Sequence, residues 1–78
     1  MSTIYDSRYR ACIALLKSRR TALNLTQAVI AEKLGVPQAY VSKYETGQRR
    51  IDIVELLDIC NVLNLSISSL LTEINKAK

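Results

Sequence analysis

The 78-residue sequence contains no histidine and only two cysteines, Cys12 and Cys60. Metal sites are usually built from clustered histidine, cysteine and carboxylate ligands, so this composition argues against a bound metal. The sequence also lacks a glycine-rich phosphate loop and an acid pair suited to catalysis, and a helical chain of this length offers little room for a substrate pocket. We therefore expect neither an enzyme nor a cofactor. A small-molecule effector site is not expected either, because there is no second domain to house one.

Long hydrophobic runs are missing as well. No apolar run approaches the ~20 residues of a membrane-spanning helix, and the first residues lack the charged-then-apolar pattern of a secretory signal. Two cysteines in a chain of this kind are typical of a reduced, cytosolic protein, and a disulfide is the less favoured interpretation. The sequence thus predicts a cytoplasmic protein without a membrane partner.

What the sequence does contain is apolar residues at helical spacing. They make up 49% of the chain, enough for residues 1–78 to fold as a single domain. In the first segment they recur at three- and four-residue steps, on one helical face, at Tyr5, Tyr9, Cys12, Ile13 and Leu16. With the later segments, this spacing predicts helices over about 6–22, 27–34, 37–46, 53–63 and from 67 onward, with 75–78 frayed.

Capping residues place several of these boundaries. A side-chain oxygen just before a helix accepts a hydrogen bond from a free backbone amide, so the first helix is expected to be capped by Asp6 or Ser7. The same reasoning places caps at Thr26, at Ser66 and at an Asp52–Glu55 capping box, and it places Pro37 in the first turn of the third helix.

The segment 27–46, QAVIAEKLGVPQAYVSKYET, fits two short helices joined by a turn. Ala31 supplies the small side chain needed where two helices cross, Gly35 suits a turn that requires positive φ, and Val41 packs the second helix onto the first. The remaining buried side chains are expected to be Ile30, Leu34, Val36 and Tyr44. This arrangement is a helix-turn-helix, whose second helix enters a DNA groove. Residues 26–46 therefore predict double-stranded DNA as the partner.

Charge is divided unevenly between the two parts of the chain. Residues 1–50 carry nine basic and three acidic side chains, a balance of +6, whereas residues 51–78 carry two basic and four acidic ones, a balance of −2. The basic part contains the helix-turn-helix, which favours a polyanionic partner for that part.

The second part is too apolar for one small core. Between Ile51 and Ile74, 14 of 24 residues are apolar, and the fourth helix carries two apolar stripes, one on Val54, Leu57 and Cys60 and one on Ile59, Val62 and Leu63. An exposed stripe usually marks an interface, and a homodimer needs only one self-complementary patch. Residues 51–75 are therefore the expected dimerisation region. A broad intramolecular core, with the fifth helix folded over the fourth, is the alternative.

Residues 10–66 resemble the small helix-turn-helix repressors of the phage repressor/Cro type, the xenobiotic-response-element family. The likeness is carried by Arg20, Leu25-Thr26-Gln27, Ile30-Ala31, Leu34-Gly35-Val36, Val41-Ser42-Lys43-Tyr44-Glu45 and Gly47. It implies an all-α, compact five-helix bundle of the lambda-repressor-like type that binds operator DNA, commonly as a dimer on palindromic sites. A transcriptional regulator, acting as a repressor, is the function expected from it. The alternative is an antitoxin-like or adaptor module whose apolar second part binds another protein.

The resemblance also assigns roles to residues. It implies that Gln27 contacts a phosphate, that Gln38 contacts a base edge, and that Arg20 and Glu45 form a partly buried ion pair. Lys43 suits guanine, and the Ala39 methyl suits thymine, although many relatives carry a polar residue at that position. The predicted base-contacting set is Gln38, Ala39, Ser42, Lys43 and Thr46, and the predicted phosphate-contacting set is Gln27, Arg19, Tyr40, Gln48, Arg49 and Arg50. For Tyr40, packing is the favoured role, and Arg49 and Arg50 have the alternative of being solvated loop charges.

Overall fold

The computed structural model describes residues 6–77 and contains, within them, five α-helices and no strand. The helices are α1 (Ser7–Ala22), α2 (Gln27–Leu34), α3 (Gln38–Glu45), α4 (Ile53–Val62) and α5 (Ile67–Lys76). The predicted all-α class is confirmed. Tyr5 and Lys78, which were assigned to the first stripe and the frayed end, lie outside the described residues.

Side-chain caps begin four of the five helices. The Asp6 carboxylate accepts from the Arg8 amide at 2.8 Å, so Asp6 and not Ser7 caps α1. Thr26 and Ser66 accept from the amides three residues ahead of them, as predicted. The capping box is complete, because the Glu55 amide donates to Asp52 at 2.7 Å and the Asp52 amide donates to Glu55 at 2.9 Å.

Four predicted boundaries differ from the structure. Pro37 is extended, with φ −64° and ψ 152°, and lies one residue before α3 instead of in its first turn. Helices α3 and α4 each end one residue earlier than predicted, at Glu45 and Val62. At the other end of the chain, α5 continues to Lys76 instead of fraying from Asn75. The Ser7 hydroxyl donates to the Ala77 carbonyl at 3.1 Å, which ties the end of α5 to the first turn of α1.

The chain reverses through left-handed residues after four helices, with Gly47 at φ 80° after α3. Gly35 ends α2 with φ 71°, and the next amide, Val36, donates back to the Ala31 carbonyl at 3.0 Å. Asn24 and Asn64 adopt φ 58° and 52° after α1 and α4. Asparagine tolerates this region better than most residues do, so each turn closes without glycine.

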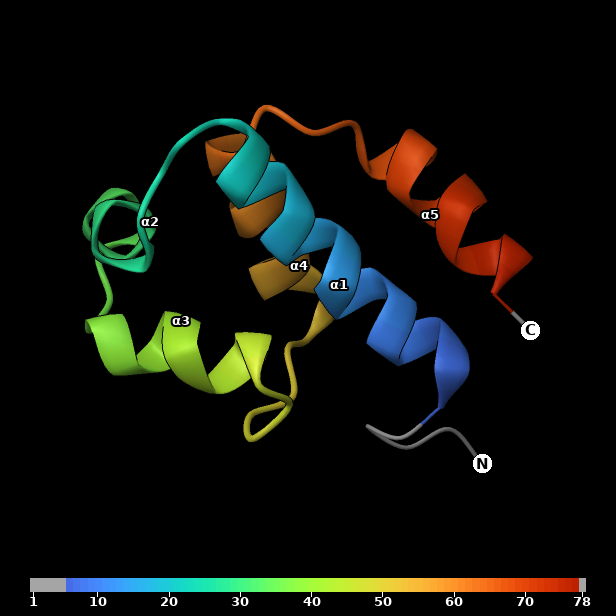
Figure 1. The fold of residues 1–78 in the computed structure, drawn as a ribbon, viewed down its shortest axis with the longest axis horizontal. Coiled ribbons are helices and arrows are strands. Elements are labelled where there is room, and N and C mark those ends of the chain that lie inside the picture. Colours follow the sequence, from blue (N-terminus) through green and yellow to red (C-terminus); the bar gives the residue numbers. More distant parts are fainter. Residues whose placement is uncertain (1–5, 78) are drawn as a thin grey trace.

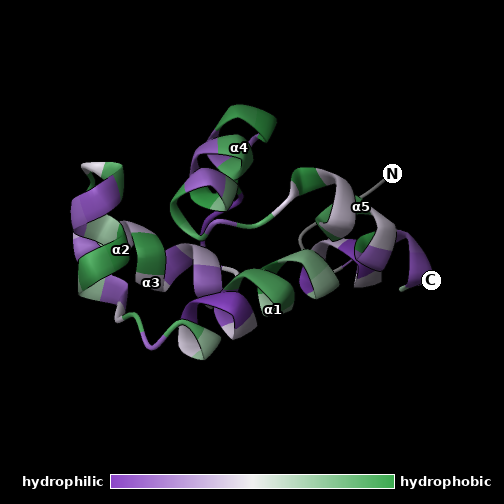
Figure 2. Ribbon diagram, turned by 90° about the horizontal axis from the view of Figure 1, so that it is seen from above, coloured by the Kyte–Doolittle hydropathy of each residue, from purple (hydrophilic) through white to green (hydrophobic). Residues whose placement is uncertain are grey.

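The helices pack as a connected set, with α2 on α3 and α4, and α1 on α3 and α5. In Figure 1, α4 lies behind α1, and the view turned by 90° shows α4 projecting away from the other helices (Figure 2). The most deeply buried side chains come from every helix and from the residue that follows α4: Leu16, Ile30, Val41, Tyr44, Ile59, Leu63 and Leu70. The core therefore holds α1, α2 and α3 in a fixed relation.

One face of α4 is not covered. Leu56, Ile59 and Cys60 are buried, whereas Ile53 and Val54 are each 62% exposed and Leu57 is 45% exposed. The predicted stripe that joined Val54 and Leu57 to Cys60 is corrected accordingly, since Cys60 belongs to the core. α5 packs on α1, so the alternative in which it folds over α4 is not what the structure shows.

Both cysteines are buried and free. Burial raises the pKa of the Cys12 thiol to about 11, and nearby Cys60 adds to that shift. A thiol with so high a pKa is almost entirely protonated near neutral pH and is a poor nucleophile. No group of three or more metal-ligating side chains occurs among residues 6–77. Over the same residues no single helix is long and apolar enough to cross a membrane, and the α4–α5 pair, which passes that test only when joined, is bent by 115°.

Two adjacent leucines of α5 test this description of the core. Leu70 is 2% exposed and Leu71 is 51% exposed. We expect Leu70→Ala to lower the free energy of unfolding by ~2–5 kcal/mol, because it removes buried methyl groups and leaves a cavity. Leu71→Ala is the matched control, with an expected change within ~0.5 kcal/mol. Urea unfolding followed by circular dichroism measures both, and equal losses would contradict this placement of the core.

Candidate nucleic-acid interface

The outer face of α3 carries the side chains predicted to contact bases. Val41 and Tyr44 are buried against the other helices, which turns the opposite side of α3 to solvent. Residues three and four apart share a face of a helix, so the predicted base-contacting residues form one surface. Four of them are exposed and Ser42 is half-buried; the set is Gln38, Ala39, Ser42, Lys43 and Thr46. A major groove of about 12 Å width admits a helix with such a face.

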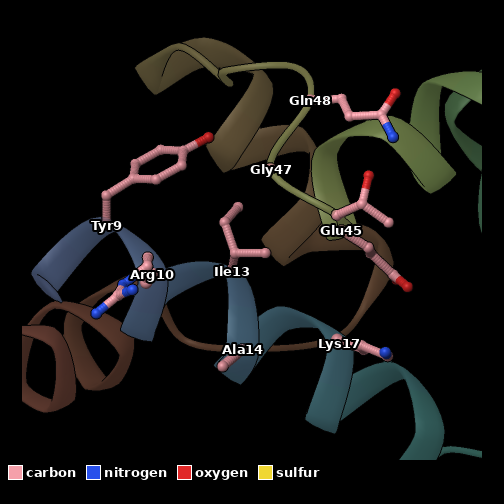
Figure 3. Close-up of a pocket in the computed structure, with 9 residues that line it drawn as sticks. Tyr9, Arg10, Ile13, Ala14, Lys17, Glu45, Gly47 and Gln48 are labelled. Atoms are coloured by element: carbon pink, nitrogen blue, oxygen red, sulfur yellow. The ribbon is translucent and has the colours of Figure 1, made fainter. Parts of the chain in front are cut away.

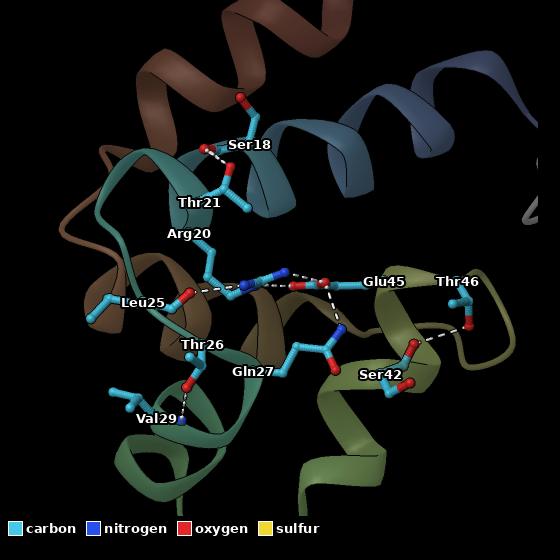
Figure 4. Close-up of polar contacts among 10 residues, drawn as sticks. All are labelled: Ser18, Arg20, Thr21, Leu25, Thr26, Gln27, Val29, Ser42, Glu45 and Thr46. Carbon is cyan, nitrogen blue, oxygen red and sulfur yellow. Dashed lines mark hydrogen bonds and ion pairs between the residues drawn. The ribbon is translucent and has the colours of Figure 1, made fainter.

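A buried ion pair holds α3 to α1. The Arg20 guanidinium donates to both Glu45 oxygens, at 2.7 and 2.9 Å, and its third contact is to the Leu25 carbonyl at 2.8 Å (Figure 4). The side chains are 11% and 2% exposed. The hydrogen bond to Glu45 raises the pKa of Arg20, so the guanidinium stays charged at every physiological pH. These contacts fix the end of α3 relative to α1 and to the α1–α2 turn.

Gln27, the first residue of α2, joins the same cluster. Its side-chain nitrogen donates to Glu45 at 2.9 Å (Figure 4). An amide has a second N–H and a carbonyl oxygen, so Gln27 can brace α3 and still offer a group to a ligand. The structure thus shows Gln27 bracing α3, and the phosphate contact that the family resemblance implies stays a prediction.

The Thr46 hydroxyl is already used as a donor. It bonds to the Ser42 carbonyl at 3.0 Å, within the last turn before the chain leaves α3 (Figure 4). Only the oxygen lone pairs of Thr46 therefore face outward, and any base contact from this side chain would be as an acceptor.

Glu55 binds two residues that were predicted to contact phosphate, Tyr40 and Arg49. Tyr40 donates its hydroxyl proton to Glu55 at 2.8 Å, and Arg49 forms an ion pair with Glu55 at 2.9 Å while lying 4.4 Å from the centre of the Tyr40 ring. Desolvation and the bond to Glu55 raise the pKa of Tyr40 to about 12. The Asp52 amide and Arg49 lower the pKa of Glu55. Tyr40 thus packs against Arg49 and bonds to α4, the structural role favoured for it. While its hydroxyl proton is donated to Glu55, it has no donor for a phosphate.

Arg50 differs from Arg49 in its surroundings. It is exposed and lies 5.1 Å from the centre of the Tyr9 ring, and no carboxylate pairs with it among the residues that the structure describes. Tyr9 also accepts from the Ile51 amide at 3.1 Å, which fixes the start of the segment that leads into α4. Gln48, in the same connector, is exposed.

Arg19, which was predicted to contact a phosphate, binds elsewhere within the protein. Its guanidinium donates to the carbonyls of Leu63 and Asn64, at 3.0 Å each. The final carbonyls of a helix have no partner within the helix, and Arg19 supplies one at the end of α4. The sequence contained no local signal for this contact, because the two segments are 44 and 45 residues apart.

A cleft of about 580 Å³ lies between α1 and the connector that follows α3 (Figure 3). Its walls include Arg10 and Lys17 from α1, and Thr46 and Gln48 from the other side. Neither Arg10 nor Lys17 was singled out from the sequence. Their seven-residue separation, two helical turns on one face, was the available signal.

Several known proteins resemble this chain in sequence and in structure. A solved structure of an XRE-family like protein from Pseudomonas syringae is 37% identical, covers 94% of this chain and 89% of its own, and superposes with a TM-score of 0.86. The family model described as Helix-turn-helix matches residues 16–70. The chain belongs to the XRE family of helix-turn-helix proteins.

Other similar proteins have a lower sequence identity or a longer chain. The structure of the clp gene regulator ClgR from C. glutamicum is 28% identical and covers 87% of both chains, with a TM-score of 0.77. The HTH-type transcriptional regulator YqaE of Bacillus subtilis is 39% identical over 56 residues, which are 72% of this chain and 48% of YqaE. The phage transcriptional repressor RstR of Vibrio cholerae is 34% identical over 55 residues, 70% of this chain and 49% of RstR. This XRE-family chain thus spans about half the length of these two curated relatives.

The ion pair beneath α3 can be tested against an exposed one. We expect Glu45→Ala to lower the free energy of unfolding by ~3–5 kcal/mol, because it leaves the Arg20 charge buried without its partner. Glu73→Ala removes the partner of Lys76 from a pair whose side chains are 69% and 53% exposed, and we expect a loss of no more than ~1 kcal/mol. Thermal and urea unfolding measure both variants. Equal effects would mean that the pair beneath α3 is effectively solvated.

Proposed function

We propose that this chain is the DNA-binding part of a transcriptional regulator and inserts α3 into the major groove of double-stranded DNA. The observation that carries this proposal is the exposed, largely polar face of α3, held in place from beneath by Arg20, Gln27 and Glu45. A rigid helix can present side chains to base edges without losing much conformational freedom on binding. The names of the longer relatives, which include transcriptional regulators and one phage repressor, support a repressor function.

Base recognition is assigned to the outward side chains of α3. The Gln38 amide pairs with adenine through one donor and one acceptor, and Lys43 donates to guanine O6 or N7. Ala39 places a methyl group against thymine, and Ser42 and Thr46 complete the surface. Four of these five side chains are already exposed, so binding requires little rearrangement.

Phosphate contacts are assigned to residues beside α3. Gln27, Gln48 and Arg50 offer free donors on the two sides of the helix. Arg49 contributes its charge to the same side while it remains paired with Glu55. Such contacts orient the domain and give affinity that depends on salt, but they do not select sequence.

The chain acts as a homodimer in this proposal, through the uncovered face of α4. Ile53 and Leu57 are four residues apart, and Val54 and Leu57 three apart, so these exposed apolar side chains form one patch. Two copies related by a two-fold axis cover the same patch on each other. Two α3 helices about one helical turn of DNA apart, ~34 Å, would then bind a palindromic operator. The cytoplasm, predicted from the sequence, is the proposed location of the protein.

The same patch supports a second candidate function. An uncovered apolar face also fits a protein-interaction module, in which residues 51–75 bind a different protein and DNA binding is secondary. A regulator without a partner should self-associate through α4, whereas an interaction module should remain a monomer until that protein is present.

The proposed base recognition predicts different behaviour for two substitutions. Selection of bound duplexes from a random pool at ~150 mM salt should enrich an inverted repeat, since weak phosphate-only binding is reduced there. On the selected site, Gln38→Ala should relax preference at one position and cost ~1–3 kcal/mol. Arg50→Ala should weaken all sequences about equally and flatten the salt dependence by about one unit. A base-selective loss in Arg50→Ala would overturn its assignment, and a lack of enrichment with folded protein would overturn sequence-specific binding.

The homodimer predicts a second pair of variants, measured without DNA. Val54→Glu places a charge in the α4 patch and should shift sedimentation equilibrium from dimer to monomer, because an unpaired charge is costly to bury at an interface. Ala28→Glu adds the same charge at an exposed position of α2 and should leave the dimer intact. A wild-type chain that remains monomeric at all concentrations would favour the interaction module instead.

A further inference from the structure

The cleft between α1 and the connector after α3 is lined by two cationic side chains of α1. Its opposite wall is continuous with the outer face of α3. Arg10 and Lys17 lie on α1, on either side of Ala14, and Gln48 and Gly47 lie across from them (Figure 3). Thr46, the last of the predicted base-contacting residues, also lines the cleft. A ligand that lies along α3 would therefore reach the cleft.

The charge in this cleft is not neutralised. Arg10 and Lys17 are exposed and form no ion pair with any carboxylate of residues 6–77. Glu45 lines the cleft, but its carboxylate is already bound by Arg20 and Gln27. The two cations thus act on solvent and ligands without a compensating charge nearby.

The backbone of the connector offers little to an anion. The amides of Thr46, Gly47 and Gln48 donate to carbonyls of Ser42, Tyr44 and Lys43, at 3.1, 3.3 and 2.8 Å. Donors for a ligand in this cleft must therefore come from side chains. The main ones are Arg10 and Lys17, and the side-chain amide of Gln48 lies opposite them.

We propose that this cleft is a further phosphate-binding site, in which Arg10 and Lys17 contact phosphates of the DNA strand beside the groove that α3 enters. The inference rests on the proposed DNA binding and extends its contact surface from α3 to α1. Seven residues of helix separate the two cations by about 10 Å along α1. That separation suits two phosphates of one strand better than a single anion.

The exposure of the cations also favours a duplex over a small acid. A small-molecule site encloses most of its ligand and places its polar groups in a buried position. Arg10 and Lys17 instead lie at the surface, as expected for contacts to a ligand that remains mostly outside the protein.

The test compares two double variants that remove the same charge. Arg10→Gln with Lys17→Gln removes both cations from the cleft. Lys33→Gln with Lys76→Gln removes two cations from the ends of α2 and α5. Each protein is titrated with the same duplex between 50 and 200 mM salt. In the cleft variant, the slope of log affinity against log salt concentration should be less steep by about 1.8, since each lost phosphate contact reduces the slope by about 0.9. Base preference should be unchanged, and the control should keep the wild-type slope.

Ethylation interference identifies the contacts directly. Phosphates whose ethylation blocks binding of the wild type, and no longer affects the cleft variant, are those held by Arg10 and Lys17. Circular dichroism checks that the double variant is folded. If it is not, the single variants Arg10→Gln and Lys17→Gln replace it, each with a slope change of about 0.9.

The outcomes separate the two proposals. A wild type that binds no duplex refutes the proposed function itself. A wild type that binds, together with equal slopes for both double variants and an unchanged set of sensitive phosphates, overturns only the cleft. The last experiment is a titration with inorganic phosphate alone, monitored by NMR through the side-chain amide resonance of Gln48. Saturation at millimolar phosphate, lost in the cleft variant, would assign the site to a small anion and overturn the duplex as its occupant.

Discussion

The buried cluster of Arg20, Glu45 and Gln27 is the constraint on which the candidate interface depends. It joins the last part of α1, the first residue of α2 and the last residue of α3, and through the Leu25 carbonyl it includes the turn between α1 and α2. A buried ion pair adds little net stability compared with apolar packing, but its geometry is demanding. Its contribution here is orientation, because the outer face of α3 has its direction only while Glu45 stays where Arg20 holds it.

A second set of contacts positions the connector after α3. Tyr40 and Arg49 converge on Glu55, and Tyr9 accepts the Ile51 amide beneath Arg50. These contacts divide the basic side chains into two groups. Arg20 and Arg49 are bound by carboxylates and maintain the fold, whereas Arg10, Lys17, Lys43 and Arg50 have no carboxylate partner in the described part of the chain. The positive charge available to a ligand is therefore carried by these unpaired side chains, and not by Arg20 or Arg49.

Much of the fold follows from local rules that the sequence displays. Thr26, Ser66 and the Asp52–Glu55 box act through amides three residues away, and Gly35 acts through its own backbone. The contacts that the sequence did not predict involve partners distant in sequence. Arg19 binds carbonyls at the end of α4, Tyr40 donates to a residue of α4, and the end of α5 is held by Ser7. The base-contacting set could be placed on one face because helical spacing alone decides it, and Arg10 and Lys17 were missed because their importance depends on which loop lies across from α1.

The division of labour within α3 limits how such a domain can change its specificity. Of the eight residues Gln38–Glu45, Tyr40, Val41, Tyr44 and Glu45 are committed to partners elsewhere in the protein. The other four, Gln38, Ala39, Ser42 and Lys43, have side chains with no such commitment. Transplanting the whole of α3 from a relative would therefore disturb the host scaffold, whereas exchanging these four positions leaves its supports in place. In the proposed DNA complex, a change of base preference would therefore arise at these four positions of α3 and at Thr46, which follows it, without altering the contacts that hold α3.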